Sequence, residues 1–111
     1  MAAAIYVQEG RAVDYTPSAD VAAGDVVVQG DLAGVARTPI AANAPGSVAV
    51  WGVFDIAKAS GAGAGITVGT KVYWDATNKV ATATAGTNKF LGKTTKAAAD
   101  ADATVRVRLS Q

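Results

Sequence analysis

The segment from Gly86 to Thr94 is the part of the sequence that most resembles a site for chemistry. It reads GTNKFLGKT, and its Gly-Lys-Thr ending is that of a phosphate-binding P-loop. A P-loop places four residues between its two glycines, whereas five residues lie between Gly86 and Gly92. An Ala-Thr alternation precedes the segment and a short Ala/Asp-rich stretch follows it, in place of the buried strand and long helix that the motif needs. The sequence therefore predicts that the protein neither binds nor hydrolyses ATP.

Most residue types that support catalysis are missing. The 111 residues include no His and no Cys, which excludes His-based triads, disulfides and the usual transition-metal sites. The acidic residues are scattered, mostly beside Gly, Ala or Asn, where Asp typically forms turns and caps. They are Glu9, Asp14, Asp20, Asp25, Asp31, Asp55, Asp75, Asp100 and Asp102. We expect no catalytic residue, no metal site, no cofactor and no small-molecule substrate.

Basic and aromatic side chains keep single-stranded nucleic-acid binding open as an alternative. Arg106 and Arg108 could share one face with the lysines Lys71, Lys79, Lys89, Lys93 and Lys96. The net charge is only +1, however, and affinity for nucleic acid requires many phosphate contacts. Tyr73 and Trp74 could stack on bases, but neighbouring strand residues point to opposite faces, so only one of the two could do so. We therefore expect no nucleic-acid partner.

The first residues, MAAAIYVQEGR, do not have the pattern of a targeting signal. They contain no basic segment followed by a long apolar stretch, and no run in the sequence approaches the length of a membrane span. We expect a protein that is soluble where it is made and has no membrane partner.

Short apolar runs separated by turn residues predict an all-β domain. Gly, Pro, Asn and Asp recur about every eight to twelve residues, the spacing of strands in sandwiches and barrels. We predict a small β-barrel or β-sandwich with short connecting loops and at most one short helix, within residues 95–102. The predicted strands are 5–7, 12–15, 26–28, 32–36, 47–54, 69–74, 79–84, 90–93 and 104–109.

Three of these regions carry more specific expectations. The glycine-rich stretch 60–65 predicts a flexible surface loop. Residues 69–84 predict a hairpin with a four-residue connection at 75–78. The strict alternation of 104–109 places three apolar side chains inward and both arginines outward. The inward residues are Val105, Val107 and Leu109.

The supply of large core side chains is small. Half of the residues are apolar, but almost half of these are alanine. Small domains with thin cores commonly gain stability from disulfides, metals or oligomerisation, and only oligomerisation remains open without Cys and His. The larger aromatic residues are most simply core anchors, and some of them could also form a subunit interface. The candidate interface residues are Trp51, Phe54, Tyr73 and Trp74.

Short segments along nearly the whole chain resemble the decoration, or cement, proteins of tailed-phage capsids. The matching segments are 6–10, 13–16, 21–27, 34–36, 52–54, 72–75, 91–93 and 105–109. Members of this family, formerly a phage domain of unknown function, have also carried a recombinase-like label, which the failed P-loop does not support. The resemblance implies a compact β subunit, usually trimeric, that binds the outside of an icosahedral head and braces neighbouring capsid subunits.

From the resemblance we expect a non-enzymatic structural protein, made in the host cytoplasm and located on the capsid exterior. Its partner would be the major capsid protein, and its own assembly a homotrimer. Residues 1–15 would form an N-terminal arm or first strand, and 16–111 a single β domain. The apolar start could either dock on the capsid or fray as an ordinary terminus; the docking candidates are Ala2, Ala3, Ala4, Ile5 and Tyr6. Another virion-associated adapter or fibre-base module is the main alternative, ahead of a single-strand-binding module.

Overall fold

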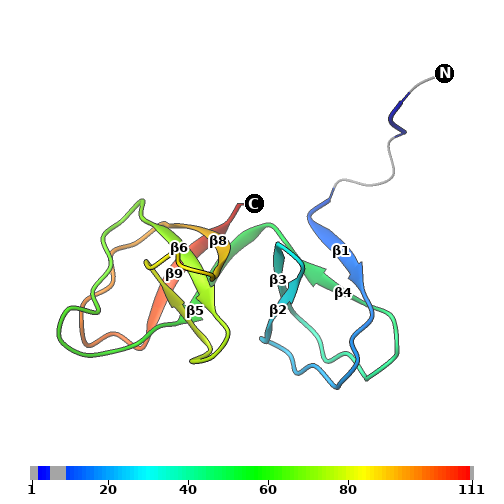
Figure 1. Ribbon diagram of the computed structural model, residues 1–111, viewed down its shortest axis with the longest axis horizontal. Coiled ribbons are helices and arrows are strands. Elements are labelled where there is room, and N and C mark those ends of the chain that lie inside the picture. Colours follow the sequence, from blue (N-terminus) through cyan, green and yellow to red (C-terminus); the bar gives the residue numbers. More distant parts are fainter. Residues whose placement is uncertain (1–2, 6–9, 111) are drawn as a thin grey trace.

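The computed structural model describes residues 3–5 and 10–110. The strands between residues 12 and 109 form two antiparallel β-sheets lying side by side (Figure 1). The four-stranded sheet has the order β1-β4-β3-β2 and the five-stranded sheet the order β5-β9-β8-β6-β7. The strands are β1 (Ala12–Tyr15), β2 (Val26–Gln29), β3 (Leu32–Ala36), β4 (Gly46–Ala49), β5 (Gly52–Ala57), β6 (Lys71–Asp75), β7 (Val80–Thr82), β8 (Lys89–Thr94) and β9 (Thr104–Leu109). The predicted all-β class is confirmed.

Residues 95–102, for which at most one short helix was predicted, form bends, a turn and an isolated bridge between Ala98 and Ile66. One local prediction is wrong. The predicted strand 47–54 is two strands in different sheets, joined through Val50 and Trp51. Gly52, the first residue of β5, has a φ of 130°, which other residues rarely adopt. This glycine lets the chain change sheets inside a run of apolar residues that reads as continuous.

The β3 strand is one of the two inner strands of the four-stranded sheet and is buried on both faces. Ala33 and Val35 face the five-stranded sheet, whereas Ala36 belongs to a second apolar cluster on the opposite face. That second cluster consists of Val27, Ala36, Ile40 and Val48. The valine-rich β2 strand beside it has Val27 buried and both neighbouring valines half-buried.

The five-stranded sheet curls so that its edge strands β5 and β7 approach each other. An isolated parallel bridge joins Lys58, just after β5, to Ala81 in β7, without a regular ladder that would close a barrel. The predicted hairpin is confirmed as β6 and β7, with its connection at 76–79. The connection begins one residue later than predicted, because Asp75 ends β6 and accepts hydrogen bonds from the amides of Thr77 and Asn78, at 3.0 and 3.1 Å.

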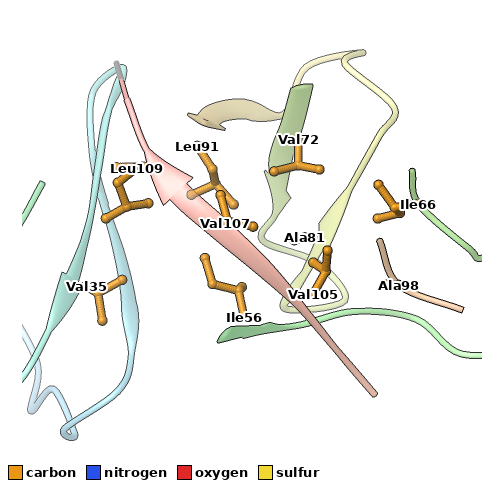
Figure 2. Packing of buried hydrophobic residues seen from close by; sticks show 11 residues of the cluster. Val35, Ile56, Ile66, Val72, Ala81, Leu91, Ala98, Val105, Val107 and Leu109 are labelled. Atoms are coloured by element: carbon orange, nitrogen blue, oxygen red, sulfur yellow. The ribbon is translucent and has the colours of Figure 1, made fainter. Parts of the chain in front are cut away.

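The main core fills the inside of this curled sheet and extends to β3 (Figure 2). Its fully buried side chains are Leu91, Leu109, Val72, Val105 and Val107. The alternation predicted for β9 is confirmed, because its apolar residues are buried and both arginines are exposed. At the junction with the other sheet, Val35 of β3 belongs to the same cluster as Leu109 of β9. The two sheets therefore share one core.

The glycine-rich loop 60–65 lies at the surface, as predicted, and is attached to the loop that precedes β9. The Asp100 side chain accepts hydrogen bonds from the amides of Gly65 and Gly63, at 2.7 and 3.3 Å. The backbone oxygen of Asp100 accepts a third bond, of 2.8 Å, from the amide of Gly61. One aspartate thus holds three positions of a stretch whose own composition favours no structure.

Candidate functional site

The P-loop-like segment has the wrong geometry for binding phosphate. A turn at Gly86 leads directly into β8, and no helix follows that strand. Lys93 is exposed, whereas the Thr94 side chain is buried and donates a 2.7 Å hydrogen bond from Oγ1 to the backbone oxygen of Thr67. The lysine and the threonine therefore lie on opposite sides of a strand. Lys93 and Thr94 therefore cannot contact the same phosphate, as the lysine and the threonine of a P-loop do.

Several carboxylates act within turns, as their sequence neighbours predicted, but the same prediction is wrong for Asp14 and Asp55, which lie within strands β1 and β5. Asp25 accepts from the amide of Ala22 at 3.0 Å, and Asp102 accepts from that of Ala99 at 2.8 Å. Hydrogen bonds from the backbone and side chain of Asn78 lower the pKa of Asp75. Within residues 3–5 and 10–110, no group of three or more His, Cys, Asp or Glu could hold a metal ion. The described part of the chain also contains no helix long and apolar enough to cross a bilayer.

The four aromatic residues predicted for an interface lie on two separate surfaces. Trp51 and Tyr73 belong to the outer face of the five-stranded sheet, the face turned away from the core. Trp51 is 45% exposed, and Tyr73 packs edge-to-face on Phe90 with ring centroids 5.6 Å apart. Phe54 and Trp74 point the other way and pack against the main core. The sequence rule that Tyr73 and Trp74 face opposite sides is thus confirmed.

Between the two sheets lies an open cleft of about 630 Å³. Val26 and Val28 of β2 form one wall, Phe54 forms the other, and Trp74 lies at the β6–β7 hairpin. These four side chains are half-buried, so the cleft leaves apolar surface accessible to solvent.

A row of three cations crosses the outer face of the five-stranded sheet. Arg108 of β9 lies opposite Lys93 of β8, and Lys93 lies opposite Lys71 of β6. We call these three residues the basic row. All three are exposed, and none forms an ion pair with the described residues.

One end of the basic row is joined to Trp51. The guanidinium carbon of Arg108 lies 5.9 Å from the centroid of the Trp51 ring, and that of Arg11 lies 4.8 Å from it. Val53, which is 55% exposed, is paired with Arg108 on the other side, in β5. The outer face therefore combines positive charge with exposed apolar surface.

The neighbouring charges on this face are paired. Arg106 donates to both carboxylate oxygens of Asp55, at 2.9 and 3.2 Å. These hydrogen bonds lower the pKa of Asp55 and raise that of Arg106. Because Asp55 and Arg106 lie directly opposite each other in β5 and β9, the sheet pairs opposite charges beside the basic row but not within it.

The predicted docking residues are only partly within the described chain. Ala3, Ala4 and Ile5 are exposed, Ile5 to 83%, whereas Ala2 and Tyr6 lie outside the described residues. The described chain continues from Gly10, and the backbone oxygen of Arg11 accepts a 2.9 Å hydrogen bond from the amide of Val50. The Arg11 guanidinium lies next to the Trp51 ring.

Sequence reasoning found the components of the outer face but missed their alignment. The alternation within β9 gave the outward direction of Arg108, and Lys71 and Lys93 were recognised as basic residues that could share a face. Their position in a single row depends on the strand order β9-β8-β6. No local pattern in the sequence encodes that order.

Comparison with known proteins gives one match. The model of a family described as "Phage cement protein" matches residues 7–109, nearly the whole chain. No curated protein and no solved structure matches this chain.

Proposed function

Because the chain belongs to the phage cement protein family, we propose that it binds the outer surface of a phage head and stabilises the capsid lattice without catalysing a reaction. The family has a structural role in association with the phage capsid. The observation that carries the proposal is the match over residues 7–109 together with the all-β fold. Synthesis in the host cytoplasm and attachment to the major capsid protein complete the proposed role.

The stabilising effect follows from mass action. A ligand that binds the assembled lattice, and not its dispersed subunits, shifts the equilibrium toward the lattice. Many copies on a repeating surface need only modest affinity each, because their contributions add. The role requires interaction surfaces, and the protein offers the outer face and the apolar cleft.

The test compares heads with and without the bound protein. Heads that carry it should resist higher temperatures or more chelator before they release DNA, measured with a DNA-binding dye. Heads that are equally fragile in both states would refute the bracing role. If the protein instead co-sediments with tails and not with heads, the adapter or fibre-base alternative is correct.

We further propose that the protein is a homotrimer whose subunits cover the apolar cleft at Phe54 and Trp74. A threefold assembly uses heterologous contacts that close on rotation, and it adds buried area that a thin monomer core lacks. Light scattering should give three times the 11.0 kDa chain mass. A monomer mass at micromolar concentration would contradict this assembly.

The N-terminal segment is proposed to dock on the capsid. The 83% exposure of Ile5 supports this idea, and the strand pairing described for the chain starts only at Ala12. Deletion of residues 1–4 should therefore leave the thermal midpoint nearly unchanged and weaken co-sedimentation with heads. If the truncated protein unfolds, the segment belongs to the folded domain and the docking idea is wrong.

A further inference from the structure

We propose that the basic row of Lys71, Lys93 and Arg108 faces the capsid and recognises a carboxylate-rich patch on the shell. This inference rests on the proposed attachment to the head and adds the side of the protein that attaches and the chemistry of its partner. It starts from the strand register, which places the three cations on consecutive strands.

The charge arrangement of the row does not serve the stability of the subunit. Like charges directly opposite each other on neighbouring strands are destabilising, and the row contains two such pairs in succession. The adjacent Asp55–Arg106 pair shows that the same face can accommodate an opposite-charge pair. An acidic partner would supply the carboxylates that the row lacks.

The surroundings of the row suit a contact with protein. Val53 and Trp51 are 55% and 45% exposed beside Arg108. Trp and Arg are the residue types that most often dominate binding energy at protein interfaces. The Trp51 ring also limits the positions of the Arg108 guanidinium through a cation–π contact, so less side-chain freedom is lost on binding.

Nucleic acid fits the same face less well. Binding of single strands depends on aromatic faces open for stacking, and the Trp51 ring already has a guanidinium within 4.8 Å. Tyr73 and Phe90 pack on each other, and Trp74 packs against the core. Three unpaired cations would also neutralise few phosphates. The observations therefore favour a protein surface.

The experiment compares two double variants with the same change in charge. Lys71→Glu/Lys93→Glu reverses two charges of the row, and Arg37→Glu/Lys96→Glu reverses two exposed cations that belong neither to the row nor to the lining of the cleft. Both are mixed with purified heads that lack the protein, and binding is measured by co-sedimentation over a range of NaCl concentrations. We expect wild-type binding to weaken with salt, the row variant to bind at least about tenfold more weakly, and the control to bind like wild type.

The row variant should remain folded. Its two changes leave one like-charge pair in the row, between positions 71 and 93, and replace the other by an acid opposite Arg108, so the thermal midpoint should not fall. Carbodiimide cross-linking gives a second readout, since it joins lysines directly to carboxylates. Mass spectrometry should find Lys71 and Lys93 linked to Asp or Glu of the capsid protein.

Each contrary outcome has a separate meaning. This inference alone would be overturned if the row variant bound heads with wild-type affinity. It would also be overturned if cross-links formed at Lys79 but not at Lys71 or Lys93. Failure of the wild-type protein to bind heads would overturn the proposed function as well. If the row variant binds heads normally but loses salt-sensitive binding to a labelled single-stranded DNA, the row is a nucleic-acid site.

Discussion

At Gly92, in β8, the neighbouring strand occupies the space that a side chain would need. A Cβ there would collide with the backbone oxygen of Arg108 and lie 3.1 Å from the Cα of Leu109. These are backbone atoms of the adjacent strand β9, which cannot move without disturbing the sheet. We expect Gly92→Ala to lower the free energy of unfolding by about 2 to 3 kcal/mol, measured by chemical denaturation.

Gly46→Ala is the matched control for this prediction. The three heavy atoms nearest to a Cβ at Gly46 all belong to the side chain of Ile40, the closest at 2.7 Å, and a side chain can shift more easily than the backbone of a paired strand. The loss of stability should therefore be smaller than for Gly92→Ala. Equal losses would show that the backbone contact is not what excludes a side chain at Gly92.

Two exposed carboxylates give the protein a specific acid response. Hydrogen bonds from Arg106 lower the pKa of Asp55 below 3.8, and those from Lys89 do the same for Asp31. A carboxyl whose pKa is lower in the folded state stabilises the fold above its unfolded pKa, and this contribution is lost as the pH falls through the folded pKa.

The predicted consequence is seen below about pH 4. The thermal midpoint of the wild type should fall more steeply there than that of Asp31→Asn/Asp55→Asn, which lacks both titrating groups. Differential scanning fluorimetry between about pH 6 and pH 2 would measure both profiles. Parallel profiles would mean that neither ion pair contributes to folding.

At the scale of elements, a buried lysine joins the end of β5 to the loop before β9. Lys58 is 5% exposed, and its ammonium donates to the backbone oxygens of Ala59, Asp102 and Asp100, at 2.7, 3.0 and 3.4 Å. Replacing this side chain by an apolar one leaves carbonyl groups without their donor, which costs roughly 1 to 3 kcal/mol for each buried group.

We therefore predict that Lys58→Met destabilises the protein by about 2 kcal/mol and loosens the attached loops. Hydrogen exchange measured by mass spectrometry should become faster in residues 58–65 and 98–103. Lys79→Met, at an exposed position in the β6–β7 turn, is the control and should leave these rates unchanged. Unaltered exchange in Lys58→Met would show that the backbone bonds alone hold the loops.

At the scale of the whole molecule, the shared core makes the two sheets one folding unit. Leu109 is fully buried and lies in the same cluster as Ala33 and Val35 of the other sheet. We expect Leu109→Ala to lower the free energy of unfolding by about 2 to 5 kcal/mol. Tryptophan fluorescence and far-UV circular dichroism should report one coincident transition. Two separate transitions would show that the sheets unfold independently.

The sequence by itself determined the features that depend on neighbours along the chain. Alternation set the inward side of Val105, Val107 and Leu109, and turn residues marked the β6–β7 hairpin. The absence of His and Cys and the spacing from Gly86 to Gly92 removed whole classes of chemistry. Local stereochemistry suffices for these conclusions, because a strand has a fixed period of two and a turn needs particular residues.

Only the tertiary structure decided which strands are neighbours. Pairing between distant segments depends on the packing of the whole chain, so no window of sequence shows that Lys71, Lys93 and Arg108 share a row. The change of sheet at Gly52 is also not visible in the sequence. Apolar residues continue on both sides of this glycine, although the chain passes from one sheet to the other there. The tertiary structure was also needed to show that Trp51 and Tyr73 lie on the outer face, whereas Phe54 and Trp74 pack against the core. A side chain on a strand is core or surface only according to what packs against it.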